Sequence, residues 1–115
     1  MPLKLVAMLK RHPDLSYEEF VEHWRDRHGP LIRNTPGISQ HIQRYEQHTR
    51  HDPGPWGGSE GIDGVAIQWF ADWDAWQGFL AAPEYAELIA PDEARFLDVG
   101  SVSFIICNEP TVVMA

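Results

Sequence analysis

The sequence predicts a single α+β domain made of two successive β-α-β units. Segments of alternating apolar residues, typical of strands, begin and end each half of the chain. Between them, apolar residues recur at spacings of three and four, as on one face of a helix. The 115 residues suffice for one core without a metal or disulfide, since a domain of this size buries roughly two-thirds of its unfolded surface. We therefore expect residues 1–115 to form one domain.

The first predicted strand covers residues 3–12. Its alternation gives two faces, of which the second is also partly apolar: Leu3, Leu5, Ala7 and Leu9 on one, and Lys4, Val6, Met8 and Lys10 on the other.

The first predicted helix begins after Ser16, which forms a capping-box pattern with Glu19. It runs to about His28, where Gly29-Pro30 is expected to stop it. Its apolar stripe contains Tyr17, Phe20, Val21 and Trp24 and ends in a polar residue, His28.

A second strand is predicted over residues 38–48, with His41, Gln43, Tyr45 and Gln47 on one face. This polar segment suits an edge strand or the lining of a polar cavity. The long loop that follows, residues 51–64, is rich in glycine and proline and contains Trp56.

The second half repeats the order of the first. A strand over residues 64–70 precedes a helix capped by Asp72 or Asp74, and a last strand covers residues 101–108. Pro83 is expected to begin another helical turn, and residues 91–96 a short third piece. The side chains of the first of these helices that are expected to face inward are Trp73, Trp76, Phe79 and Leu80, and the apolar residues that recur with helical spacing after Pro83 are Tyr85, Leu88 and Ile89.

Two such units predict a ferredoxin-like βαββαβ domain, with a four-stranded antiparallel sheet and helices on one face. The other face of the sheet, with Val6 and Met8, would then be apolar and uncovered. Such a face predicts a homodimer.

Composition narrows the function classes. The formal net charge of −8, from 9 basic and 17 acidic residues, argues against nucleic acid as a partner. The single Cys107 excludes an internal disulfide and a cysteine-clustered metal site. No apolar run reaches the ~18 residues of a membrane span, and the segment after Met1 lacks the apolar stretch of a signal peptide, so a cytoplasmic protein without membrane contact is expected. Five Trp, three Tyr and five Phe must line a core, an interface or a ligand pocket.

Several motifs together resemble the EthD-like family of dimeric α+β-barrel proteins, over nearly the whole chain. They are Ser16-x-x-Glu19-Phe20, Trp24-x-x-x-His28-Gly29-Pro30-Leu31, Pro36-Gly37, Asp63-Gly64-Val65-Ala66 with Trp69-Phe70, and Asp92-Glu93-Ala94-Arg95-Phe96-Leu97-Asp98.

The resemblance implies a ferredoxin-like subunit whose sheet closes into a barrel across a dimer, with a ligand cleft between sheet and helices. Wider relatives include polyketide cyclases, muconolactone-type isomerases and cofactor-free monooxygenases. This chain departs from the family where Ile67, followed by Gln68, replaces an acidic residue that members often carry before Trp-Phe.

The candidate catalytic residues are His28, His41 and Tyr45. A histidine titrates near pH 6.5 and suits proton transfer, although His28 could instead merely terminate its helix, and His41 and Tyr45 could lie on a solvated face. No metal site or cofactor is expected. His23 and His28 are five residues apart, a poor spacing for one helix face, and chance placement accounts better than a ligand set for His48 and His51 beside Asp52. The candidate substrate-binding residues are Tyr17, Trp24, Gln68, Trp69, Trp73 and Trp76.

Three functions remain open at this point. The first is a cofactor-free acid–base enzyme of the cyclase, dehydratase, lyase or isomerase type, acting on a small hydrophobic aromatic or polyketide-like substrate. The second is a cofactor-free monooxygenase of an electron-rich phenol or anthrone. The third is a non-catalytic small-ligand-binding or accessory protein of a catabolic pathway.

Overall fold

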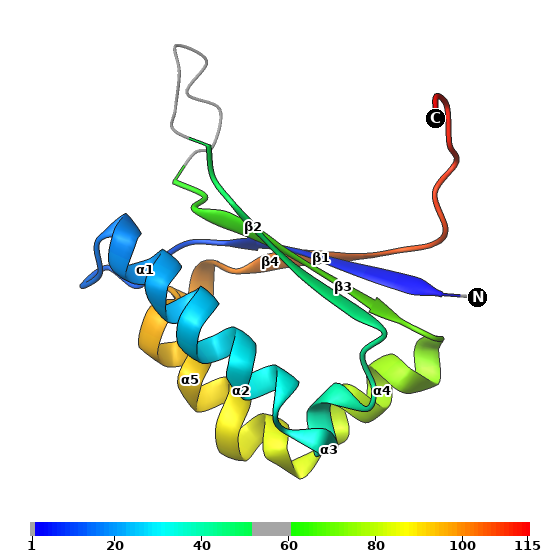
Figure 1. The fold of residues 1–115 in the computed structure, drawn as a ribbon, viewed down its shortest axis with the longest axis horizontal. Coiled ribbons are helices and arrows are strands. Elements are labelled where there is room, and N and C mark those ends of the chain that lie inside the picture. The colour runs from blue at the N-terminus through cyan, green and yellow to red at the C-terminus, as the bar shows by residue number, and fades with distance from the viewer. Residues whose placement is uncertain (1, 52–60) are drawn as a thin grey trace.

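The computed structural model describes residues 2–51 and 61–115, so most of the predicted loop 51–64, with Trp56, lies outside the described residues. The described chain forms two layers, a sheet and a set of helices that cover one of its faces (Figure 1). The sheet has four strands in the order β2-β3-β1-β4, and each neighbouring pair is antiparallel. The strands are β1 (Leu3–Leu9), β2 (Arg44–Thr49), β3 (Gly64–Phe70) and β4 (Ser103–Cys107).

This strand order confirms the predicted ferredoxin-like fold, because each β-α-β unit contributes one central and one edge strand. The register places Ala7 opposite Ala66 on one side and Phe104 on the other. Side chains of these three residues therefore share the inner face, towards the helices, while Val6, Ile67 and Ile105 share the outer face.

The first helical segment continues past the proline that was expected to end it. The capping box of Ser16 and Glu19 opens α1 (Tyr17–His23), as predicted. A π-helical turn, η1 (Trp24–His28), joins it to α2 (Gly29–Arg33). The Gly29 amide reaches back five residues to the Trp24 carbonyl, and Pro30 stands in the first turn of α2, where its missing N–H is tolerated.

The second half repeats this arrangement. The turn η2 (Tyr85–Ile89) is π-helical and leads directly into α5 (Ala90–Phe96), whose second residue is Pro91. The predicted separate piece 91–96 is therefore the end of a continuous helical segment. Before it, α4 (Trp73–Ala81) is capped by Asp72, whose side chain accepts a hydrogen bond from the Ala75 amide.

The second strand begins later than predicted. Pro36 opens a short helix, α3 (Pro36–Ser39), which buries Ile38, and the chain then turns at His41. Consequently His41 and Gln43 precede β2, and the prediction that they share a strand face with Tyr45 is wrong.

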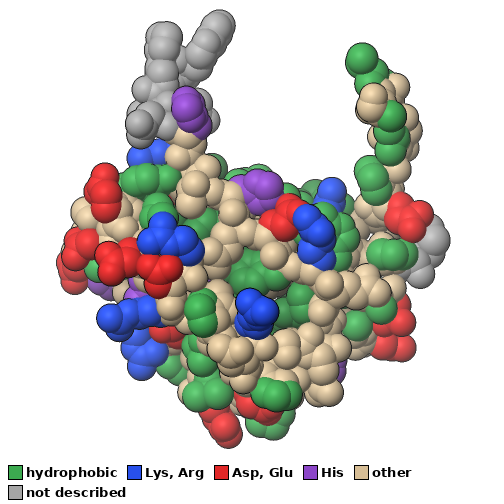
Figure 2. All heavy atoms as spheres, viewed as in Figure 1, with side chains coloured by type: hydrophobic (Ala, Val, Ile, Leu, Met, Phe, Trp, Pro, Cys, Tyr) green, Lys and Arg blue, Asp and Glu red, His purple; other side chains and the backbone are tan. Residues whose placement is uncertain are grey.

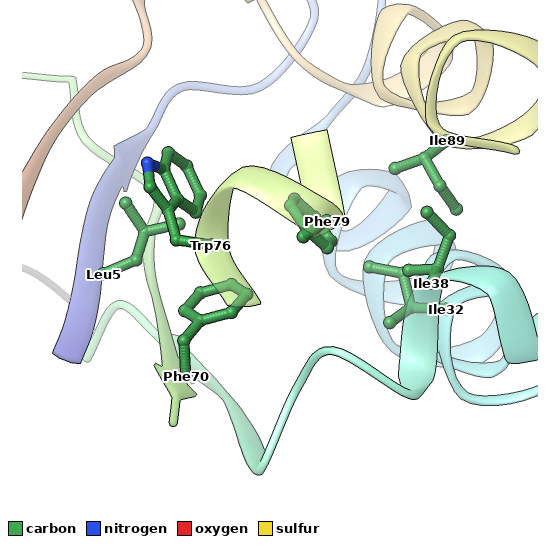
Figure 3. Packing of buried hydrophobic residues seen from close by; sticks show 7 residues of the cluster. All are labelled: Leu5, Ile32, Ile38, Phe70, Trp76, Phe79 and Ile89. Atoms are coloured by element: carbon green, nitrogen blue, oxygen red, sulfur yellow. The ribbon is translucent and has the colours of Figure 1, made fainter. Parts of the chain in front are cut away.

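The core holds two clusters on the inner face. In one of these clusters Trp76 lies beside Leu5, and Phe79 points towards Ile32, Ile38 and Ile89 of the other helical segments (Figure 3). Trp73 was also expected to face inward, but it is 53% exposed, because α4 turns only one side to the sheet. Leu80 is 45% exposed and still lines the cavity described below. Leu88 is likewise exposed. The first cluster contains Leu5, Ile32, Ile38, Phe70, Trp76, Phe79 and Ile89, and the second Ala7, Leu9, Phe20, Trp24, Ala66, Phe96 and Leu97.

Asp63, just before β3, is buried and paired. Its carboxylate accepts hydrogen bonds from the Arg11 amide at 3.0 Å and the Arg11 guanidinium at 2.8 Å, and Arg50 lies 3.5 Å away. This ion pair ties the end of β1 to the end of β2, so the Asp63 of the family motif has a structural role here.

No helix of the described residues is long and apolar enough to cross a membrane.

Gly64 gives a test of the packing between β3 and η1. A Cβ at this position would lie 2.6 Å from the Trp24 ring and 3.0 Å from the His48 carbonyl oxygen. We expect Gly64→Ala to lower the free energy of unfolding by about 1–3 kcal/mol, the usual cost of overpacking, in urea denaturation. The control is Gly100→Ala, whose Cβ meets nothing within 4 Å and should change stability by less than about 0.5 kcal/mol. Equal stability of the two variants would contradict this packing.

Candidate functional site

A cavity of about 300 Å³ lies between the inner face of the sheet and the helical segments. This volume is at the lower end of the range for ligand pockets. Most of its wall is aliphatic or aromatic, which suits an apolar ligand. The polar side chains in the wall are His28, Tyr45, Gln68, Tyr85 and Glu93, together with the indole of Trp24 and the indole of Trp76.

His28 is the last residue of η1 and is only 4% exposed. Its Nδ1 lies 2.7 Å from Oδ2 of Asp92, in the first turn of α5, and its ring packs against Phe96. The hydrogen bond thus joins the two helical segments. With Nδ1 engaged in this way, Nε2 is the ring nitrogen left for the cavity.

Asp92 receives more than one hydrogen bond. The His23 Nε2 lies 2.9 Å from its Oδ1, and Arg95 is 3.4 Å from the same oxygen. Burial alone would raise the pKa of Asp92, but the hydrogen bonds and charges of His28 and His23 outweigh it and leave the pKa below its ordinary value. Asp92 is therefore a carboxylate at neutral pH.

Burial lowers the pKa of His28 below its ordinary value of 6.5, and the nearby Asp92 offsets this only in part. The imidazole is accordingly neutral at pH 7. A neutral ring beside a carboxylate carries its proton on Nδ1, which donates to Asp92. Nε2 then holds a free lone pair, and this is the state of a general base.

Tyr45 offers a hydrogen-bond donor to the same cavity. Its hydroxyl oxygen accepts from Trp24 Nε1 at 3.0 Å and from Gln47 Nε2 at 3.2 Å. None of the described residues accepts the Tyr45 proton. Burial raises the pKa of Tyr45 to about 12, so the phenol keeps that proton.

Gln68 is the neighbour of Tyr45 in the register of β2 and β3, and both side chains point to the inner face. The Gln68 side chain is buried and lines the cavity, so its amide could bind a ligand oxygen beside the Tyr45 hydroxyl. Ile67 faces outward and cannot serve the cavity.

Two functional candidates were missed in the sequence, namely Tyr85 and Glu93. The Tyr85 hydroxyl donates to Glu93 Oε1 at 3.0 Å, and both residues line the cavity. Burial raises the pKa of both groups. The signal was present in the Asp92-Glu93 pair of the family motif, where two successive acids open a helix, but nothing in the sequence indicated which of them turns inward.

Five of the nine predicted site residues line the cavity: His28, Tyr45, Trp24, Gln68 and Trp76. The other four do not. His41 lies outside and packs its ring against Gly78 of α4, because the turn after α3 carries it away from β2. Tyr17 donates to the Arg50 carbonyl, Trp69 lies on the outer face under Arg44, and Trp73 is exposed.

A second hollow lies between α2 and β2, with basic side chains on its rim (Figure 2). Ile32 and Tyr45 belong to its wall and to that of the cavity. It is more open to solvent than the cavity and its wall is more polar, so the cavity is the better candidate site for an apolar ligand. Within the described residues no group of three His, Cys, Asp or Glu side chains could hold a metal ion.

Comparison with known proteins shows which family model matches this chain and which solved structures it resembles. The EthD domain matches residues 12–100. Among solved structures, the chain is similar to an EthD family protein from Bacillus halodurans, with a TM-score of 0.69, 21% identity, and coverage of 96% of this chain and 100% of that one. No curated protein matches the chain in sequence.

Two further structures share the fold. A dimeric protein of unknown function with a ferredoxin-like fold from Bacteroides fragilis has a TM-score of 0.68 at 17% identity, covering 94% of this chain and 96% of that one. SnoaB, a cofactor-independent oxygenase from Streptomyces nogalater, has a TM-score of 0.66 at 16% identity, covering 97% of this chain and 96% of that one.

The state of His28 can be measured directly. Ring ¹⁵N NMR should show a neutral imidazole with Nδ1 protonated at pH 7, titrating below pH 6.5. Asp92→Asn should lower the pKa of His28 further, because the Asp92 carboxylate favours the imidazolium. It should also reduce the free energy of unfolding by about 1.5–3 kcal/mol, since hydrogen bonds to a charged group are lost.

The control is Asp98→Asn, an exposed acid two residues beyond α5, which should leave the His28 resonances unchanged. A proton on Nε2 at pH 7, or a titration above pH 6.5, would contradict the assigned arrangement.

Proposed function

Because the chain belongs to the EthD domain family, we propose that its cavity is the active site of a cofactor-free acid–base enzyme. The observation that carries the proposal is the position of His28, which is buried in the cavity wall and held at Nδ1 by Asp92. The substrate class is a small hydrophobic aromatic or polyketide-like molecule, which suits the aromatic walls.

Each polar group has a step to perform. His28 Nε2 takes a proton from a carbon next to a substrate carbonyl, and Asp92 stabilises the imidazolium that forms. The Tyr45 hydroxyl and the Gln68 amide donate to the carbonyl oxygen, where negative charge develops. The imidazolium then returns the proton to another atom of the substrate, which yields ring closure, loss of water, bond cleavage or isomerisation, depending on the substrate.

A cofactor-free monooxygenase is the second candidate, favoured by the similarity to SnoaB. In that reaction His28 would only deprotonate a phenol or anthrone. The resulting anion would supply the electrons that reduce O₂, with one oxygen atom entering the product as a carbonyl and the other leaving as water. Oxygen consumption distinguishes this reaction from the first.

We also propose that the working unit is a homodimer joined through the outer face of the sheet. Apolar residues occupy the middle of that face, with the charged Lys4, Arg44 and Glu46 beside them. No helix of the described residues covers it, and Ile105 on it is 56% exposed. An uncovered apolar face of this kind favours association. The Bacteroides fragilis protein, which shares the fold, is described as dimeric. The apolar residues of this face are Val6, Met8, Val65, Ile67, Trp69 and Ile105.

The enzymatic proposal is tested with His28→Gln. The substrates are a linear poly-β-ketone, an enol lactone and an anthrone, with products followed by mass spectrometry and O₂ by electrode. We expect turnover by the unmodified protein and a decrease in kcat/KM of about 10²- to 10⁴-fold in His28→Gln, the usual contribution of a general base. His12→Gln is the control and should keep full activity, because the His12 side chain does not line the cavity.

A product of unchanged mass or one that has lost water supports the acid–base reaction, and stoichiometric O₂ uptake supports the monooxygenase. Equal turnover by His28→Gln and the unmodified protein would remove His28 from the mechanism. Binding of these compounds without any turnover would support the non-catalytic alternative.

The dimer is tested with Ile105→Asp. Light scattering after size exclusion should give the mass of two chains for the unmodified protein and of one chain for this variant, because a carboxylate cannot be buried unpaired in an apolar interface. Leu88→Asp, at an exposed apolar position on the helical side, is the matched control and should remain dimeric. A monomeric unmodified protein would refute the assignment.

A further inference from the structure

We propose that Glu93, held by Tyr85, is a second proton-carrying group of the cavity and restricts it to uncharged ligands with a hydrogen-bond acceptor, such as aryl ketones. This inference rests on the proposed role of the cavity as the substrate site. It adds a catalytic residue that donates a proton and names the charge state of the ligand.

The helix separates the roles of Asp92 and Glu93. Successive residues of an α-helix point about 100° apart, and here Asp92 faces η1 while Glu93 faces the cavity. The carboxylate oxygens of Asp92 accept hydrogen bonds from His28, His23 and Arg95, whereas Glu93 can contact a ligand in the cavity.

Glu93 has a neutral partner and no cationic one. Its Oε1 accepts the Tyr85 hydroxyl at 3.0 Å, and within the described residues no lysine, arginine or histidine pairs with it. The second oxygen, Oε2, accepts no hydrogen bond from a described residue, so it is available to a bound molecule. Tyr85 therefore fixes the orientation of the carboxyl group and leaves one oxygen free.

Among the described residues, no lysine or arginine belongs to the cavity wall. A carboxylate or phosphate ligand would lose its hydration shell here without gaining a counter-ion, and it would lie close to Glu93, so its binding is disfavoured. An uncharged ketone does not carry this desolvation penalty. Burial, with the Asp92 charge beside it, raises the pKa of Glu93 and so favours the protonated acid, which can donate to a ketone oxygen.

With Glu93 in its protonated form and His28 neutral, the cavity can complete a proton transfer without net charge. His28 Nε2 receives the proton from the substrate carbon, and Glu93 gives its proton to the carbonyl oxygen, so the ligand becomes a neutral enol. The enzyme then holds an imidazolium and a carboxylate. The reverse transfers, with the proton from His28 going to another carbon and the enol proton returning to Glu93, restore both groups. Carboxyl groups kept protonated by their surroundings act as acids in this way.

The test uses two probes of nearly equal shape, 2-acetylnaphthalene, which is neutral, and 2-naphthoate, which is an anion. Calorimetric titration of the unmodified protein should show at least about a tenfold preference for the ketone, as expected for one hydrogen bond to, or one repulsion from, an ionisable group. Affinity for the ketone should be high at low pH and fall as the pH rises through the pKa of Glu93, because the deprotonated carboxyl no longer donates.

Glu93→Gln keeps the shape and a donor at every pH. We expect its ketone affinity to be independent of pH and its discrimination against 2-naphthoate to be weaker at pH 8. Tyr85→Phe removes the hydrogen bond that lowers the pKa of Glu93, so the loss of affinity should move to higher pH. Glu87→Gln, an exposed acid on η2, is the control and should behave as the unmodified protein.

Equal affinity for the two probes, or the same pH profile in Glu93→Gln and the unmodified protein, would overturn the inference, as would failure of both probes to bind. These measurements are binding equilibria and need no turnover. If the ketone affinity depends on pH through Glu93 but no catalysis is found, only the enzymatic proposal is refuted. If catalysis depends on His28 but the ketone affinity does not depend on Glu93, only the role of Glu93 is refuted.

Discussion

The hydrogen bond between His28 and Asp92 is the constraint on which the site depends. It joins the end of η1 in the first half of the chain to the start of α5 in the second, at a point where both groups are shielded from water. A buried carboxylate needs hydrogen-bond donors, and a buried imidazole must either be neutral or be paired with an opposite charge. The pair meets both requirements, and it fixes the separation of the two helical segments above the sheet. The cavity is the space that this separation leaves.

The two π-helical turns make that contact possible. In each half, a five-residue π-helical turn is followed by a short α-helix with proline as its second residue, Pro30 in one and Pro91 in the other. A π-helical turn widens the helix and rotates the residues after it, which brings His28 inward at the end of its turn. Without the wider turn, a proline here would break or kink the segment. The rule that Gly-Pro ends a helix therefore fails at the point where the candidate catalytic residue lies.

The sequence predicted what local rules control. The alternation of β1 and β3, the capping box at Ser16 and the cap at Asp72 follow from periodicity and from side chains bonding to nearby amides. What it could not predict depends on contacts distant in the chain. Asp92 lies 64 residues from His28, and the direction of Glu93 depends on the rotation of α5. His41 was wrongly placed on a strand because the short helix after Pro36 consumes the residues that alternation assigned to β2.

The sheet separates the chemistry from the proposed assembly. Along β1 and β3, alternate residues serve opposite faces, so that Ala66 and Gln68 line the cavity while Ile67 and Trp69 lie outside. The proposed dimer interface and the proposed active site therefore use the same strands, but no side chain of β3 belongs to both. A substitution on the outer face can change association and leave the wall of the cavity in place.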